Sequence, residues 1–185
     1  SIGRKIDTRV ADDAPAWFFI DIQPDQIDRF MEIASGTEGI SQVAKTPMLR
    51  GRVTELGGIA AADYDMRNGS AWVLRGDRAL TWSATQPESG ELIAGEWWPE
   101  DYDSTPLASM TAEEANELGV WIGDTVSFNV LGRPVTAKIT NIRDVEWESF
   151  SINFVFVLSP GVLDKAPHSW MATAHPDDED AAIRV

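Results

Sequence analysis

The clearest hydrophobic pattern in this chain lies at residues 16–24, where five large apolar residues fall within the six positions from Trp17 to Ile22. A short run rich in aromatic and β-branched residues, bounded by a turn signal, is typical of a buried strand. Pro24 is tolerated at the first position of a helix, which would place Gln23 at the N-cap. The pattern therefore predicts a strand that leads directly into a helix.

The next segment changes to a helical period and then back to extended structure. Apolar residues at i, i+3, i+4 and i+7 predict one buried helix face, which Gly36 would end. These residues are Ile27, Phe30, Met31 and Ala34. A strand is expected at 39–44, and Pro47 is expected to break it before another strand at 48–56.

A turn-rich stretch from Gly57-Gly58 to Gly69 predicts the first border between subdomains, after which the chain becomes rich in strands. Alternation predicts strands at 80–85 and 91–98. A short helix is expected at 111–118, with Thr111 and Glu114 as a capping box and a glycine after its last residue. These elements belong to one β-rich region.

The clearest hairpin follows. Residues 125–130 alternate between apolar and polar side chains, 131–134 form the turn, and 135–142 return. We expect this twisted hairpin to belong to a small barrel-like β unit. Beyond it, a strand at 152–158, a short helix that begins at Pro160 and a strand at 170–174 complete the chain.

The order of strand, proline, helix and strand thus occurs at both ends of the chain. Two such units separated by a β-rich insertion predict an α+β fold, in which a split βαβ lobe of ferredoxin-like type carries an inserted, mostly-β, small-barrel-like lobe. The predicted division has four parts: a stalk at 1–14, the split βαβ lobe at 15–57 plus 150–176, the inserted lobe at 58–149, and an acidic tail at 177–185.

The net charge and the composition of the chain argue against several classes of function. The formal net charge of -15, from 30 acidic and 15 basic residues, repels phosphate groups and argues against nucleic-acid binding. Cysteine is absent, which removes disulfides, thiolate metal sites and a cysteine nucleophile. No apolar run approaches the roughly 20 residues that a membrane-spanning helix needs. No cofactor is expected, because the chain has no phosphate-binding glycine loop.

Two motifs carry candidate chemistry. Residues 174–179, Ala-His-Pro-Asp-Asp-Glu, resemble the signature of zinc-dependent sugar deacetylases, in which the His and the second Asp are metal ligands. His168 is the only other histidine, and no third ligand is evident, so a solvated acidic tail is the preferred interpretation. Neither a metal site nor a catalytic residue is therefore predicted.

The second motif is Glu-Trp-Trp-Pro-Glu-Asp-Tyr-Asp at 96–103. Aromatic side chains flanked by carboxylates bind sugars in some proteins and clustered carboxylates bind calcium, but tryptophans packed between lobes are the more common outcome. Trp97, Trp98 and Tyr102 are the candidate residues for contact with a partner or cargo. A metal-dependent hydrolase and a carbohydrate-binding module remain alternatives.

An ordered set of blocks resembles the extracytoplasmic domain of FtsX/MacB-type ABC transporter permeases, and within them the large permeases linked in name to lysophospholipase export or biosynthesis. The resemblance covers about residues 13–175. Its blocks are residues 16–26, 47–53, 72–77, Gly-Glu-Trp-Trp-Pro at 95–99, 118–126, 145–149 and 153–161.

The resemblance implies a fragment of an integral membrane protein at the periplasmic, extracytoplasmic face of the inner membrane, with a MacB-like periplasmic core fold. It also implies a cytoplasmic ABC ATPase as a separate subunit, whose motion this domain would pass to a periplasmic partner protein or a lipid-like cargo. The family supplies no catalytic residue in this domain, so the expectation is a transporter part and not an enzyme.

Overall fold

The computed structural model describes residues 17–147 and 152–177, and within them the chain is mixed α/β, with a large mixed sheet and two α-helices. These residues divide into two compact units. Unit 1 consists of 17–47, 152 and 168–177, and unit 2 consists of 48–147 and 153–167. The predicted stalk at 1–14 and all but the first residue of the predicted tail lie outside the described residues.

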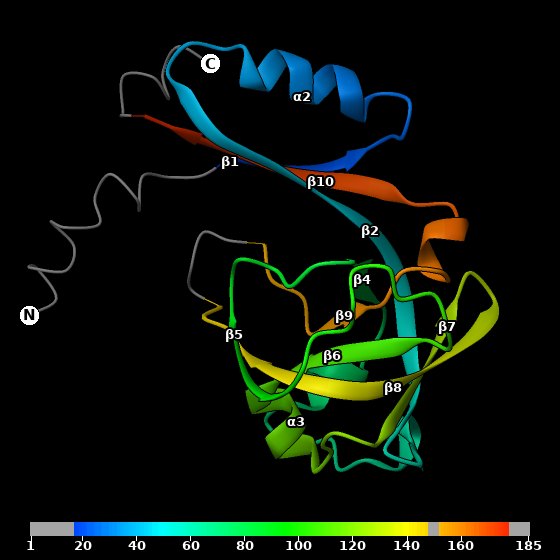
Figure 1. Cartoon of the computed structure of the whole chain (residues 1–185). Helices are drawn as coiled ribbons and strands as arrows, with labels where there is room; N and C mark the ends of the chain where they lie inside the picture. Colours follow the sequence, from blue (N-terminus) through cyan, green and yellow to red (C-terminus); the bar gives the residue numbers. More distant parts are fainter. Residues whose placement is uncertain (1–16, 148–151, 178–185) are drawn as a thin grey trace, which may run out of the picture. The chain divides into compact units, whose positions relative to one another are not determined.

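Unit 1 is a small sheet with one helix. Its strand order is β1 (Trp17–Ile22), β10 (Ser169–Pro176), β2 (Ile40–Leu56), and β1 and β10 are antiparallel. The helix α2 (Ile27–Ser35) lies along this sheet (Figure 1). The strand at 17–22, the helix that ends at Gly36 and the C-terminal strand are where the hydrophobic pattern predicted them.

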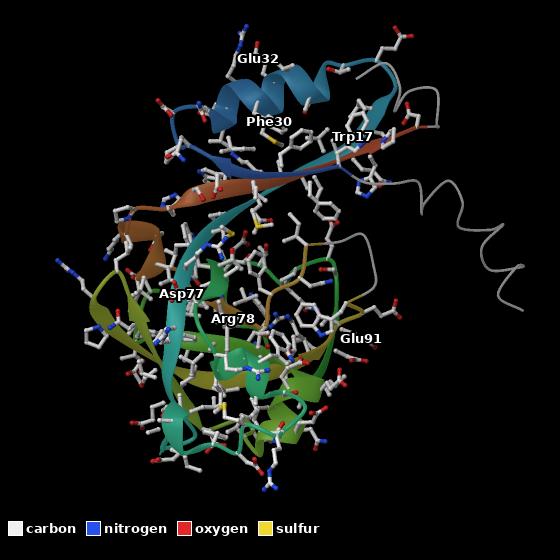
Figure 2. All side chains as sticks on the ribbon, turned by 180° about the vertical axis from the view of Figure 1, so that it is seen from behind. Trp17, Phe30, Glu32, Asp77, Arg78 and Glu91 are labelled. Carbon is white, nitrogen blue, oxygen red and sulfur yellow. The ribbon has the colours of Figure 1, made fainter. Side chains whose placement is uncertain are left out.

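The core of unit 1 forms between one face of β1–β10 and the apolar face of α2. Ile22, Ile27 and Ala172 are buried there, and the Phe19 and Phe30 rings meet edge to face at 4.8 Å. Figure 2 shows Phe30 pointing from α2 toward the sheet and Glu32 pointing away from it. The predicted helical face is thus the buried face.

The start of α2 differs from the prediction. Gln23 and Pro24 were expected to open the helix, but α2 begins at Ile27 with Gln26 at the N-cap. The carbonyl of Gln23 accepts hydrogen bonds from the N–H groups of Gln26 and Ile27, at 2.9 and 3.1 Å, and the Gln23 N–H donates to the Gln26 side chain. Pro24 therefore lies in a turn that precedes the helix.

Pro47 does not break the second strand. β2 is continuous for 17 residues, and Pro47 is the last residue of its part in unit 1. The paired partner changes there, from β10 before Pro47 to β4 (Arg78–Trp82) from Leu49 onward. A residue without an N–H is tolerated at such a change of ladder, because no hydrogen bond of a regular ladder is lost.

Unit 2 holds the larger sheet and the main core. Its pairings run in a circuit from β2 through β4, β9 (Phe156–Leu158), β6 (Leu107–Thr111), β8 (Arg133–Asp144) and β7 (Thr125–Val130) back to β2. β5 (Glu91–Gly95) adds to the outside of β8. The β4–β9 and β6–β8 pairs are parallel and the others are antiparallel.

The predicted hairpin is the β7–β8 pair. Its turn is tighter than expected, because Leu131 and Gly132 alone form it, both with positive φ, and Arg133 already pairs with Val130. The short helix α3 (Ala112–Leu118) also forms where expected, with Thr111 at the N-cap and Gly119 in the left-handed conformation after it. The Thr111 hydroxyl donates to the Glu114 carboxylate, however, and does not accept a hydrogen bond from a backbone N–H of the first turn as a capping box requires.

The borders between the units differ from the predicted ones at both ends of the insertion. Gly57-Gly58 is the turn of a hairpin between β2 and β3 (Ile59–Ala60), inside unit 2. Residues 153–167 were assigned to the split lobe, but they lie in unit 2 because β9 pairs with β4 and β6. The helix expected from Pro160 is a single 3₁₀ turn, η3 (Leu163–Lys165).

Large aliphatic and aromatic side chains fill the core of unit 2. Phe128 of β7 and Phe156 of β9 meet edge to face at 5.1 Å. Two further 3₁₀ turns, η1 (Ala61–Asp63) and η2 (Ala71–Leu74), connect β3 to β4, and Val73 and Leu74 of η2 are buried in the same core. Within the described residues, neither α-helix is long and apolar enough to cross a bilayer.

Candidate contact sites

The predicted pair Trp97 and Trp98 follows β5 and packs back on the end of β4. The two indole rings lie 4.1 Å apart at an angle of 35°. The Trp98 indole N–H donates to the Ser83 carbonyl at 2.8 Å, and the Trp97 indole N–H donates to the Ala84 carbonyl at 3.2 Å. Trp98 is only 5% exposed, so its ring belongs to the interior, whereas Trp97 is half-buried.

Tyr102 organises the loop that follows. Its backbone N–H donates to the Pro99 carbonyl at 2.9 Å, and its hydroxyl donates to the Thr105 carbonyl at 2.6 Å. The ring is half-buried, and the neighbouring carboxylates of Glu100, Asp101 and Asp103 are exposed. Of the three predicted contact residues, Trp97 and Tyr102 thus retain partly exposed rings. The burial of Trp98 counts against the carbohydrate-module alternative, which needs an exposed aromatic pair.

The deacetylase-like motif lies at the end of β10. His175 is half-buried, and its Nδ1 lies 3.4 Å from the carbonyl oxygen of Gln42 on β2. The Asp177 N–H donates to the Gly39 carbonyl at 2.7 Å, while Asp178 and Glu179 lie outside the described residues. Over residues 17–147 and 152–177, no three His, Asp or Glu side chains gather as metal ligands. The described residues of the motif therefore contact residues 39–42, at and just before the start of β2.

A buried polar cluster surrounds Arg143 in unit 2, and the sequence pattern did not predict it. Arg143 is 3% exposed, and its guanidinium donates to the Ser109 hydroxyl at 2.8 Å and to the Phe154 carbonyl. It thereby joins β8 and β6 to the segment that leads into β9. No local signal marks this residue, because the predicted strand ended one position before it and its partners are distant in sequence.

Electrostatics shape this cluster. Burial lowers the pKa of Arg143 to about 10, and the negative charge of Glu114 acts in the opposite direction. Glu114 is itself 3% exposed and accepts the hydrogen bond from Thr111. A buried cation with matched acceptors is costly to disturb, because its partners lose their hydrogen bonds when it is removed. The cluster thus attaches Phe154, which lies where the chain re-enters unit 2, to β8 and β6.

A second arrangement joins two tryptophans and an arginine. The Trp72 and Trp147 rings meet edge to face at 6.2 Å, and the Arg78 guanidinium carbon lies 5.4 Å from the centre of the Trp72 ring. Arg78 also donates to the Arg75 carbonyl at 3.2 Å. A cation over an indole face is stabilising by electrostatic attraction to the ring. This contact fixes η2 against the start of β4.

No protein-family model matches the sequence. Over 161 residues, the chain is 30% identical to the uncharacterized ABC transporter permease YbbP of Escherichia coli (strain K12). The match covers 87% of this chain and 19% of the relative, so the chain spans about a fifth of the length of the curated relative.

Among solved structures, a domain of a protein assigned as a permease from Porphyromonas gingivalis superposes with a TM-score of 0.46 and 14% sequence identity. The superposition covers 90% of this chain and 76% of that one.

Proposed function

We propose that this chain is the extracytoplasmic domain of an ABC transporter permease of the FtsX/MacB type. One observation carries the proposal: 87% of the chain aligns at 30% identity with one segment of a much longer ABC transporter permease. The sequence blocks that resemble this family lie in the same order over residues 13–175. The parent protein would then be a membrane protein that displays this domain on the outer side of the cell membrane.

Two features of the topology support a MacB-like architecture. In unit 1, the order β1-β10-β2 with α2 between β1 and β2 is compatible with the split βαβ lobe expected from the sequence. In unit 2, the circuit of paired strands is compatible with the small-barrel lobe expected from the sequence. The lysophospholipase-linked branch remains part of the proposal, and it rests on the sequence blocks alone.

In this proposal the domain transmits motion and performs no catalysis. A cytoplasmic ABC ATPase, as a separate subunit, would supply the energy. β2 contributes residues to both units, so in this proposal it is the segment through which motion would pass from one unit to the other. The domain would pass this motion to a periplasmic partner protein or a lipid-like cargo, with Trp97 and Tyr102 as the proposed contact residues.

The test uses the full-length parent protein together with the ABC ATPase subunit that the proposal requires. We expect the two to copurify from detergent-solubilised membranes and to hydrolyse ATP after reconstitution. Replacing residues 17–177 by a flexible linker should leave this complex intact, because the ATPase would bind on the opposite side of the membrane, and should abolish transport or extraction of the cargo. A parent protein that is not in the membrane, or that purifies without an ATPase, contradicts the proposal.

A further inference from the structure

We propose that Asn68-Gly69 in unit 2 is a site of spontaneous covalent modification, at which the Asn68 side chain loses ammonia and becomes aspartate or isoaspartate. Local opening of the turn at 65–70 controls the rate of this deamidation. The modification in turn breaks a link between the turn and α3. The inference concerns the chemistry of one peptide unit and does not depend on the proposed function.

The sequence singles out this position. Asn68-Gly69 is the only Asn-Gly pair in the chain, and every other asparagine precedes Glu, Val, Ile or Phe. Asparagine is a thermolabile residue, because the backbone nitrogen of the next residue can attack its side-chain carbonyl carbon. Glycine has no Cβ to hinder that approach and gives the backbone the freedom to reach it. The pair at 68–69 is therefore the most reactive one in the unfolded chain.

The reaction needs water as its only co-reactant. The Gly69 backbone N–H loses its proton to solvent, and the nitrogen attacks the side-chain carbonyl carbon of Asn68. A new C–N bond forms, the bond to the side-chain nitrogen breaks, and that nitrogen takes up a proton and leaves as ammonia. Water then adds to either carbonyl of the cyclic imide and reopens the ring, without oxidation or reduction. The product carboxyl is ionised near neutral pH, so the chain gains one negative charge.

The folded turn restrains this reaction, because each polar group of Asn68 has a partner. Its backbone N–H donates to the Asp65 carbonyl, and its carbonyl accepts the Ala71 N–H, both at 3.0 Å. The side-chain oxygen accepts the Ser70 N–H at 2.8 Å, and the side-chain nitrogen donates to the Glu117 carbonyl at 2.7 Å. A side chain held at both ends must release these hydrogen bonds before its carbonyl carbon can turn toward the attacking nitrogen.

The turn itself lies at the surface. Asp65, Met66, Arg67 and Gly69 are exposed, and Asn68 is half-buried. The Asp65 carboxylate accepts the Arg67 N–H at 2.9 Å and pairs with the Arg67 guanidinium at 3.0 Å. Exposed hydrogen bonds and ion pairs of this kind are weak, and segments held by them open without global unfolding. Asn68 therefore reacts in the folded chain, but only in the fraction of molecules whose turn is open.

The modification also affects α3. Glu117 lies in the last turn of this helix, where carbonyl groups have no partner within the helix, and the Asn68 amide donates to one of them. A carboxylate only accepts hydrogen bonds, so the product would repel the Glu117 carbonyl oxygen. The Glu117 carboxylate is close as well, because its Oε2 would lie 2.7 Å from a Cβ built on Gly69. Deamidation thus replaces an attractive contact by repulsion.

The test incubates the 185-residue chain in mildly alkaline buffer, with and without enough urea to unfold it, and locates deamidation by peptide mass spectrometry. We expect Asn68 to react before every other asparagine in both conditions, and at least about fivefold more slowly in the folded chain. Gly69→Ala should slow the reaction in urea by about tenfold, because a Cβ hinders the attack. Equal rates in the two conditions, no reaction in the folded chain, or faster reaction at another asparagine would overturn the proposal.

A matched pair of variants tests the control by the turn. Asp65→Ala removes the side chain that holds Arg67, so it should accelerate the reaction of the folded chain by at least about twofold and leave the rate in urea unchanged. Asp101→Ala, at an exposed position of another loop, should change neither rate. Equal folded-state rates for the two variants would show that the turn does not control the reaction.

A second pair tests the effect on stability. Asn68→Asp reproduces one product and should lower the thermal midpoint of unfolding by about 3 °C or more. Asn129→Asp adds the same charge but keeps its contact, because the Asn129 side-chain oxygen accepts the Gly132 N–H at 2.9 Å and a carboxylate accepts it equally well. Its midpoint should change by less than about 1 °C. Equal midpoints for Asn68→Asp and Asn129→Asp would contradict the proposed link to α3.

Discussion

Two residues of unit 2, Arg143 and Tyr64, make hydrogen bonds through polar side-chain groups that lie in or against the core. Arg143 is buried, whereas the other described Lys and Arg residues are half-buried or exposed. Tyr64 is a second case, since its hydroxyl donates to the Leu56 carbonyl at 2.7 Å and its ring packs against the main core. Arg143 also links β8 to the Phe154 carbonyl, and Tyr64 links the residue after η1 to the end of β2; neither of these two links belongs to a strand ladder. Their contributions are therefore measurable by single substitutions.

Arg143→Met should lower the free energy of unfolding by on the order of 3 kcal/mol, because Ser109, the Phe154 carbonyl and buried Glu114 would lose their compensating cation. Arg133→Met, an exposed arginine on the same strand, should change it by about 0.5 kcal/mol or less. Denaturant unfolding of the two variants provides the measurement. Equal stability of both would show that the buried cluster is not a major contributor.

Tyr64 should titrate above its ordinary value of 10.0, because burial raises the pKa of the phenol and the charge of Asp124 raises it further. Folding therefore favours the protonated form, and this stabilisation is fully present below pH 10 and is lost as the pH rises above it. Near-ultraviolet absorbance of a Tyr102→Phe variant isolates Tyr64. Asp124→Asn should lower the midpoint but keep it above 10.0, and a midpoint at or below 10.0 in the Tyr102→Phe variant would contradict this account.

At the scale of elements, the sequence pattern correctly placed those strands and helices whose contacts are with residues close in sequence. The β7–β8 hairpin, α3 and its terminal Gly119 all lie where alternation and cap signals predicted them. β6 was missed because its sequence, Leu-Ala-Ser-Met-Thr, neither alternates nor contains a β-branched apolar residue, and all of its pairing partners are distant in sequence. Pro47 was misinterpreted for the same reason, since only the change of partner strand explains its place inside β2.

Gly95 gives an element-scale prediction for β5. A Cβ at this position, where φ is +75°, would lie 2.2 Å from the Thr140 carbonyl oxygen, so Gly95→Ala should lower the free energy of unfolding by about 3 kcal/mol. Gly58→Ala, at a φ of +80° with open space around it, should cost only about 1 kcal/mol. Thermal or denaturant unfolding distinguishes the two. A larger loss for Gly58→Ala would show that the close approach of β5 to β8 is not tight.

At the scale of the whole molecule, the sequence pattern predicted two units, one inserted into the other. The borders between the two units in the structure differ from the predicted borders. Leu49–Gly51 and residues 153–167 join unit 2 because their ladders pair with β4 and β6, which no local signal indicates. The prediction of contact residues rests on side-chain chemistry alone, whereas the burial of Trp98 results from its packing beside the end of β4. The Arg143 cluster is likewise a product of tertiary pairing.

The proposal that this domain faces the outside of the cell is tested most directly by cysteine labelling of the parent protein in intact cells. The chain has no cysteine, so Ser104→Cys, at an exposed loop position, creates a unique thiol in this region, and the unsubstituted parent protein is the control for thiols elsewhere. We predict that a membrane-impermeant maleimide with access to the periplasm labels Ser104→Cys before the cytoplasmic membrane is opened. Labelling only after lysis would place the domain in the cytoplasm and contradict the proposed function.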